Sequence, residues 1–145
     1  MLLNVDDISE VLKKNSIQNG DNIFLHVDAF VTAFLEGNSI ENKIDTLING
    51  ITNCIGPSGT LVLPTFTYSS TKNKVYDPNK TQSEVGIVTE HFRKNKNVLR
   101  SSNPIFSVAS IGKLSDNFKK SSKSDCFGKG TCFDLIYKYN FWIVT

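Results

Sequence analysis

The chain has 145 residues, of which 39% are hydrophobic, and its formal net charge is +2. This length supports one hydrophobic core, which predicts a single α/β domain over residues 1–145. The scattered lysines exclude the concentrated basic surface of a nucleic-acid-binding protein, and no apolar run approaches the roughly 20 residues of a membrane span. Because the amino terminus also has no signal-like segment, we expect a soluble, cytoplasmic protein with neither a nucleic-acid nor a membrane partner.

The first third of the chain has the pattern of a helix, a strand and a second helix. Residues 5–15 place apolar side chains at helical spacing behind an acidic first turn, which predicts an amphipathic helix. Residues 22–27 form a short apolar run between turn residues, as is typical of a buried strand. From Ser39, a suitable N-cap, isoleucines and Leu47 recur at helical steps up to Gly56 and Pro57, which predict the end of the second helix.

The rest of the chain continues the alternation of strands and helices. Residues 60–64 predict a second buried strand, joined to the first by a right-handed parallel crossover, and residues 65–82 predict an irregular loop. The remaining predicted elements are a helix over 83–94, strands over 98–100 and 106–110, helices over 114–119 and 131–139, and a strand over 141–145.

These elements predict a mostly parallel sheet flanked by helices in α/β/α layers. A parallel sheet normally continues from a strand such as 141–145 into a loop and a covering helix, so the fold is expected to be incomplete at its carboxyl end.

Two histidines are the first candidates for chemistry, because histidine titrates closest to neutral pH. His26 lies near the carboxyl end of the first predicted strand, where open α/β sheets bind ligands, and two interpretations stay open: a site residue or a hydrogen-bonded core histidine. His91 lies on the helix predicted over 83–94, where a surface position is favoured. Two isolated histidines and three cysteines without CxxC spacing argue against a metal site.

Common catalytic and nucleotide-binding motifs are missing. The sequence contains no GxSxG, GxGxxG or GxxxxGK[ST] segment, which disfavours a serine hydrolase and a phosphate-loop protein. The FGKGT segment, with Gly128, Gly130 and Thr131 ahead of a helix, could offer backbone N–H groups to an anion or a pantetheine amide. On spacing alone, a plain turn is the favoured interpretation of that segment.

Five segments, in order and at matching spacing, resemble the aminoglycoside 3-N-acetyltransferase family. They are GDNIFLHVDAF at 20–30, GPSGTLVLPTFT at 56–67, DPNKTQSEVGIVTEHFR at 77–93, RSSNPIFS at 100–107 and FGKGTCFDLIY at 127–137. The resemblance covers most of the chain from about residue 20 and implies that it is the amino-terminal part of such an enzyme.

What the resemblance implies is transfer of an acetyl group from acetyl-CoA to an amine of an aminoglycoside or related amino sugar, with no metal. Carried over residue by residue, it implies catalytic roles for His26 and Glu90, although a structural salt bridge is an equally good interpretation of Glu90. The positions implied to bind acetyl-CoA are His26, Thr65, Thr67, Arg100, Ser101, Ser107, Gly130 and Thr131. For Arg100, contact with a CoA phosphate and a surface ion pair are both open.

The sequence also departs from the family pattern. The family's HSSL is here His26-Val27-Asp28-Ala29, its HP is Asn103-Pro104, and its chain continues well past residue 145. The alternative is therefore a truncated, inactive fragment that at most binds CoA, forms an oligomer, or complements a separate carboxyl-terminal chain. Such a fragment should leave apolar side chains of the strand over 141–145 exposed.

Overall fold

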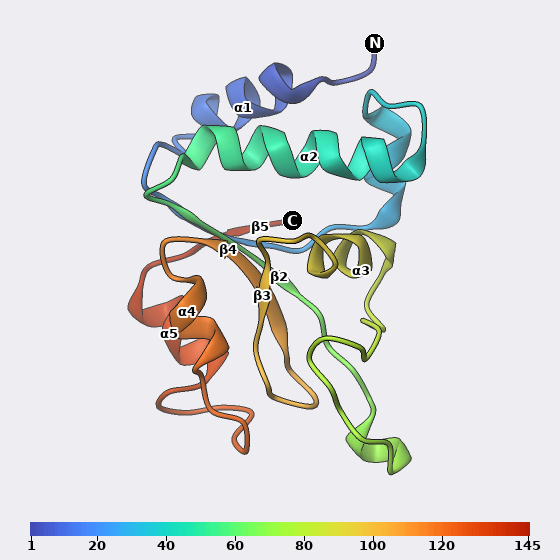
Figure 1. Cartoon of the computed structure of the whole chain (residues 1–145). Helices are drawn as coiled ribbons and strands as arrows, with labels where there is room; N and C mark the ends of the chain where they lie inside the picture. Colours follow the sequence, from blue (N-terminus) through green and yellow to red (C-terminus); the bar gives the residue numbers. More distant parts are fainter.

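The computed structural model describes all residues, 1–145, and its centre is a five-stranded sheet with the order β3-β4-β2-β1-β5 (Figure 1). The strands are β1 (Asn22–Leu25), β2 (Thr60–Pro64), β3 (Leu99–Arg100), β4 (Val108–Gly112) and β5 (Trp142–Val144). β1 pairs in parallel with β2 and β5, whereas β4 pairs antiparallel with β2 and β3. Four strands therefore share one direction, and β4 is the reversed one.

Helices cover both faces of this sheet. They are α1 (Val5–Lys14), α2 (Ile40–Ile55), α3 (Ile87–Arg93), α4 (Ser115–Lys119) and α5 (Cys132–Lys138), with short 3-10 helices η1 (Ala29–Phe34) and η2 (Ser70–Lys72). α1 and α2 lie on one side of the sheet, and α4 and α5 lie on the other (Figure 1). The predicted α/β class with helices around a sheet is confirmed.

Each face of the sheet has its own hydrophobic core. The larger core joins α1, α2 and α3 to the sheet through residues such as Ile51, Leu61 and Phe92. The smaller core packs α4 and α5 on the opposite face through Val62, Phe118 and other buried side chains. Val62 and Leu61 are neighbours in β2 and enter different cores, as the alternation of side chains along a strand requires.

Local sequence signals explain how the first two helices begin and end. Asn4 accepts hydrogen bonds from the N–H groups of Asp6 and Asp7, and Asp7 returns a bond to the Asn4 N–H, which completes a capping box for α1. Ser39 caps α2 through the N–H of Asn42, and Gly56 ends it with a φ of 63°. A positive φ at that position favours glycine.

Several predicted boundaries were wrong. The helix expected over 83–94 begins only at Ile87, because Gly86 has a φ of 128° and the Ser83 N–H bonds to the Glu90 carboxylate. The strand expected over 106–110 lies at Val108–Gly112, and η1 was not predicted. The strand expected over 141–145 exists as β5, a short edge strand.

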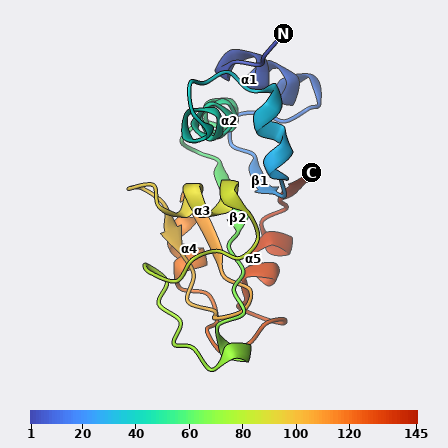
Figure 2. The same cartoon turned by 90° about the vertical axis from the view of Figure 1, so that its right-hand side faces the viewer.

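Three loops project beyond the carboxyl end of β2. They are the loop after β2, the loop between β3 and β4, and the loop between α4 and α5, and both views place them together at the end of the molecule away from α1 (Figures 1 and 2). None of the helices combines the length and apolarity needed to cross a bilayer. The expected cytoplasmic location stays a prediction.

Candidate functional site

A cleft of about 480 Å³ lies at the carboxyl ends of β1 and β2. Its lining residues are His26, Val27, Asp28, Pro64, Phe66, Val85, Thr89 and Thr145. Open α/β sheets place their ligands at this edge, beyond the carboxyl ends of the strands. The cleft is therefore the place in the fold where bound substrate would meet strand-borne side chains.

His26 is held in this cleft by its backbone and its ring. Its N–H donates to the carbonyl oxygen of Val144 at 2.8 Å, and its imidazole packs edge-on against Phe24 with ring centroids 4.4 Å apart. The imidazole is half-buried and has no hydrogen-bond partner within the chain. His26 is thus not a hydrogen-bonded core histidine, and its catalytic role stays a prediction.

Three of the residues predicted to bind the cofactor, Thr65, Arg100 and Ser107, form one buried polar cluster between the carboxyl end of β2 and strands β3 and β4. Arg100 donates from Nε to Thr65 Oγ1 at 3.1 Å and from Nη2 to the Thr65 carbonyl at 2.6 Å. Ser107 Oγ donates to the same carbonyl at 2.7 Å and lies 3.3 Å from Thr65 Oγ1. These side chains are buried and bond to one another, so any contact that they make with a cofactor stays a prediction.

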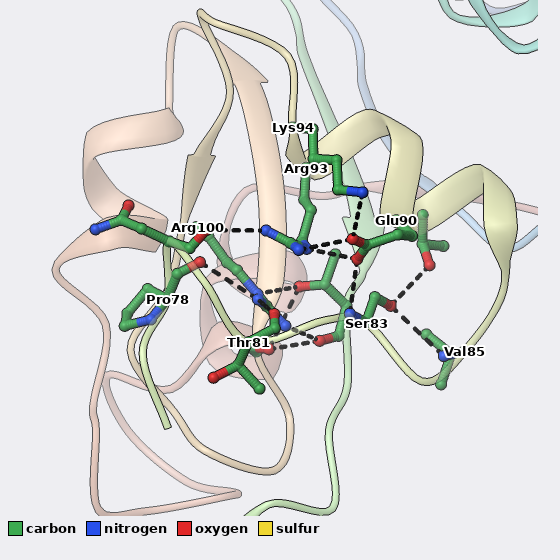
Figure 3. A network of polar contacts seen from close by, with 12 residues as sticks. Pro78, Thr81, Ser83, Val85, Glu90, Arg93, Lys94 and Arg100 are labelled. Atoms are coloured by element: carbon green, nitrogen blue, oxygen red, sulfur yellow. Dashed lines mark hydrogen bonds and ion pairs between the residues drawn. The ribbon is translucent and has the colours of Figure 1, made fainter. Parts of the chain in front are cut away.

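The Arg100 guanidinium makes more hydrogen bonds within the chain than either of its two sequence interpretations predicts. Its Nη1 donates to the carbonyl oxygens of Thr81 and Pro78 (Figure 3). The guanidinium also lies over the Tyr76 ring, 5.2 Å from the centroid. Burial lowers the pKa of this guanidinium from its ordinary value. With only 7% of the residue exposed, the surface ion-pair interpretation is wrong, and binding a phosphate would require Arg100 to give up bonds that hold the loop after β2.

Thr67 and Ser101 also hold the loops together. Thr67 Oγ1 donates to the Pro104 carbonyl at 2.6 Å, and Ser101 Oγ accepts from the Val108 N–H at 2.9 Å. Both side chains are fully buried. Thr67 thereby connects the loop after β2 to the loop between β3 and β4, whereas Ser101 joins the two ends of the latter loop.

Glu90, on α3, has both carboxylate oxygens occupied. Arg93 donates from Nε at 2.5 Å and from Nη2 at 2.6 Å, the Ser83 N–H donates at 2.8 Å, and Lys94 Nζ lies 3.0 Å away (Figure 3). Burial by itself raises the pKa of Glu90, but the hydrogen bonds from Arg93, Ser83 and Lys94 outweigh it and lower the pKa below its ordinary value. This geometry favours the structural salt bridge, while catalysis by Glu90 stays untested.

The backbone N–H groups of Gly130 and Thr131 in the FGKGT segment are already bonded to acceptors within the chain. The Gly130 N–H bonds to Asp134 Oδ2 at 2.8 Å, the Thr131 N–H bonds to the Gly128 carbonyl at 3.3 Å, and Thr131 Oγ1 caps α5 through the Asp134 N–H. Gly128 and Gly130 have φ values of 96° and 82°, which favour glycine. The arrangement is a turn leading into a helix, and the proposed contacts of Gly130 and Thr131 with a cofactor stay predictions.

The family model of the aminoglycoside 3-N-acetyltransferases matches residues 31–145, well over half of the chain. The chain belongs to the aminoglycoside 3-N-acetyltransferase family. The predicted resemblance is thereby confirmed, whereas no curated protein sequence matches the chain.

Solved structures of related proteins share this fold. A structure described as AAC-IIIb binary with CoASH superposes with a TM-score of 0.81 and 18% identity, over 95% of this chain and 57% of the other. AAC-VIa bound to sisomicin has a TM-score of 0.80 and 15% identity, and the match covers 99% of this chain and 59% of the other. The YokD protein from Bacillus subtilis has a TM-score of 0.78 and 18% identity, and the match covers 92% of this chain and 61% of the other. The chain thus spans little more than half the length of these proteins.

Within the acetyltransferase fold, the cleft contains polar side chains that the sequence did not indicate as site residues. The Asp28 carboxylate is exposed at the cleft and accepts from the Phe30 N–H at 2.7 Å, and Thr89 Oγ1 lies 2.8 Å from Ser83 Oγ. The position of Asp28 directly after the strand predicted over residues 22–27 was the available signal. His91 lies away from the cleft lining and pairs with Asp45 at 2.7 Å.

Proposed function

We propose that this chain binds acetyl-CoA and transfers its acetyl group to an amine of an aminoglycoside or related amino sugar. Membership of the aminoglycoside 3-N-acetyltransferase family supports the reaction class, and a related structure has CoA bound. The observation that carries the proposal is the cleft with His26 at the carboxyl ends of β1 and β2.

The chemistry needs a base and an acceptor site. The amine nitrogen attacks the thioester carbonyl carbon only when it is deprotonated, so an N–C bond forms, the C–S bond breaks, and the proton lost by the amine ends on the CoA thiolate. We assign the proton acceptor to His26, because its ring lines the cleft and has no internal hydrogen-bond partner. Asp28 lines the same cleft, where its carboxylate would attract an ammonium group of the acceptor.

Glu90 is given a supporting role in this proposal. It does not line the cleft, and its two carboxylate oxygens are bound by Arg93, Lys94 and the Ser83 N–H. Ser83 precedes α3, whereas Val85 and Thr89 line the cleft. The carboxylate therefore fixes the start of α3 and, through it, one wall of the cleft.

A second candidate is an inactive fragment that binds CoA or complements a separate carboxyl-terminal chain. Two observations favour it. The chain spans 57% of the CoA-bound relative, and on the edge strand β5 Trp142 is 44% and Ile143 57% exposed. Under this proposal, an added polypeptide covers β5 and completes the acceptor site.

The deciding experiment incubates the full chain with acetyl-CoA and a panel of aminoglycosides and amino sugars and measures thiol release. Titration calorimetry with CoA is run on the same sample. If the chain is the enzyme, His26→Ala should slow turnover by about 10²- to 10⁴-fold, the usual contribution of general base catalysis. The control His91→Gln removes a histidine that lies outside the cleft lining and should leave turnover unchanged.

Other outcomes separate the two candidates. CoA binding without turnover would contradict the complete enzyme and support the fragment, especially if an added carboxyl-terminal polypeptide of a relative restored turnover. Absence of CoA binding, both by the chain alone and after that polypeptide is added, would contradict both candidates.

A further inference from the structure

Asn-Gly, the dipeptide in which asparagine most readily loses its side-chain amide, occurs twice in this chain, at Asn19-Gly20 and Asn49-Gly50. In this reaction the backbone nitrogen of the second residue has to reach the asparagine Cγ, and glycine, which has no Cβ, hinders that approach least. Both asparagine side chains are exposed. Exposure therefore does not distinguish the two dipeptides, and the backbone around each glycine determines which of them reacts.

Gly50 is held inside a long helix. It lies within α2, where backbone N–H groups bond along the helix, and it is buried against α1. A Cβ added to Gly50 would lie 2.6 Å from Ile8 Cβ. For the Gly50 nitrogen to turn towards Asn49 Cγ, α2 would have to unfold locally and separate from α1. Opening of such a core element costs nearly as much as global unfolding.

Gly20 lies instead in a tight turn between α1 and β1, beside the end of α2 (Figure 1). The Asp21 N–H bonds to the Gln18 carbonyl oxygen at 3.1 Å, and Gly20 has a φ of 94°, as is typical of the third residue of a type II turn. The Gly20 N–H points out of the turn and donates to the Ile55 carbonyl oxygen at 2.8 Å. This one hydrogen bond holds the nitrogen that would attack.

The Asn19 carboxamide lies at the same junction but is not hydrogen-bonded within the chain. Its Nδ2 is 2.6 Å from the position of a Cβ added at Gly56, so the amide lies on the glycine that ends α2. None of residues 18–21 is buried. Opening of this turn exposes little apolar surface, and it therefore belongs to the local openings of low free energy.

We propose that Asn19 is a site of spontaneous deamidation, controlled by opening of the Gly20–Ile55 hydrogen bond, whereas Asn49 is protected. In the open turn the Gly20 nitrogen attacks Asn19 Cγ. A C–N bond forms, the Cγ–Nδ2 bond breaks, and ammonia leaves with the proton of the Gly20 N–H. Water then opens the cyclic imide at either carbonyl, which gives aspartate or isoaspartate at position 19. The reaction needs only water and does not depend on acetyl transfer.

The product alters the junction of α1, β1 and α2. Isoaspartate adds one carbon to the main chain inside the turn, which displaces the Gly20 N–H from the Ile55 carbonyl. Either product also adds a negative charge two residues before Asp21. The modified chain should therefore unfold at a lower temperature than the fresh chain.

Peptide mass spectrometry of the full chain, incubated at mildly alkaline pH and physiological temperature, tests the site. Deamidation at Asn19 should be at least about tenfold faster than at Asn49, which requires a difference of only about 1.4 kcal/mol between the two opening free energies. Asn19→Gln is the matched control. Its longer side chain would have to close a larger ring, so deamidation at position 19 should disappear while Asn49 is unaffected.

Hydrogen exchange measures the opening independently of the reaction. The Gly20 amide should exchange faster than the Gly50 amide. Gly56→Ala places a Cβ where the Asn19 amide lies, and it should speed both exchange at Gly20 and deamidation at Asn19.

Equal deamidation at Asn19 and Asn49, or faster exchange at Gly50 than at Gly20, overturns the inference. The effect on the junction is tested by thermal unfolding of the incubated wild type and the incubated Asn19→Gln variant. If each unfolds at the same temperature as its fresh sample, although position 19 of the wild type is modified, that effect is wrong. All of these outcomes leave the proposed function untouched, because it is tested by CoA binding and acetyl transfer.

Discussion

Glu90 and Arg93 form the most enclosed ion pair of the molecule, with side-chain exposures of 10% and 6%. A carboxylate in that position has two opposing influences on its pKa. Burial disfavours its charge, and the donors around it favour the charge and prevail. Glu90 therefore stays ionised at neutral pH, with its lone pairs already engaged, which suits it to fix α3 rather than to accept a proton from a substrate.

This charge predicts a pH-dependent stability. Glu90→Gln should lower the free energy of unfolding by about 3 kcal/mol at neutral pH, because it leaves the buried Arg93 guanidinium without its carboxylate. In the wild type the pKa of Glu90 lies below its ordinary value of 4.5 in the folded state. The stabilisation is thus fully present above pH 4.5 and is lost as the pH falls through the lowered pKa.

Urea unfolding at neutral pH and at a pH of about 3 measures this dependence. The difference in free energy of unfolding between the wild type and Glu90→Gln should be smaller at the lower pH. Glu10→Gln is the control, because Glu10 pairs with Lys14 on the exposed face of α1 and should contribute much less. The same difference in free energy of unfolding at both pH values would show that Glu90 stabilises the fold through packing and not through its charge.

Among the elements, α1 and α2 pack closely because α2 has a glycine, Gly50, at their contact. A Cβ added at Gly50 of α2 would lie 2.6 Å from Ile8 Cβ and 3.0 Å from the Val5 carbonyl oxygen. Glycine is unfavourable inside a helix by about 1 kcal/mol relative to alanine. That cost is offset here by the close approach of α1, whose Ile8 and Leu12 enter the larger core.

Helix propensity and the steric clash with α1 predict opposite changes in stability for Gly50→Ala, and the larger of the two effects decides the sign. Overpacking typically costs about 1–3 kcal/mol, which exceeds the gain in helix propensity of about 1 kcal/mol, so Gly50→Ala should destabilise the protein by up to about 2 kcal/mol. Asn49→Ala, at the adjacent exposed position of the same helix, should be neutral or slightly stabilising. Thermal unfolding of both variants checks this. A stabilised Gly50→Ala would mean that α1 moves away at little cost.

The same elements show which features could be predicted from sequence. α1, α2 and β2 were found because their apolar periodicity, caps and turns all agree. The start of α3 was misplaced because a side chain distant by seven residues, Glu90, captures the Ser83 N–H. Helix propensity does not register such a side-chain bond, so propensity alone extends the helix too far towards the amino terminus.

The candidate site was predictable in its location but not in its bonding. The position of His26 at the end of β1 followed from the strand pattern. Motif matching grouped Thr65, Arg100 and Ser107 as cofactor contacts, yet their side chains are buried in a network of bonds to one another. Sequence similarity identifies which positions belong to a site region, whereas the direction of each side chain depends on packing between loops.

For the molecule as a whole, the two edges of the sheet differ in exposure. β3 pairs with β4 at one edge and contributes the buried Arg100. At the other edge β5 pairs only with β1, and it presents Trp142 and Ile143 to solvent. An edge strand with exposed apolar side chains is a template for pairing with another chain, whether a complementing polypeptide or a second copy.

We therefore expect the chain by itself to associate at high concentration, and Ile143→Lys to shift it towards the monomer. A lysine at the edge adds charge to the surface that another strand would have to cover, and charged edges are how proteins suppress such pairing. Sedimentation velocity over a range of concentrations measures the effect. Tyr137→Lys, which changes an aromatic residue on α5 that is 84% exposed, should leave association unchanged. A wild-type chain that stays monomeric at all concentrations would contradict β5 as a pairing surface, and with it the main structural support for a complementing chain.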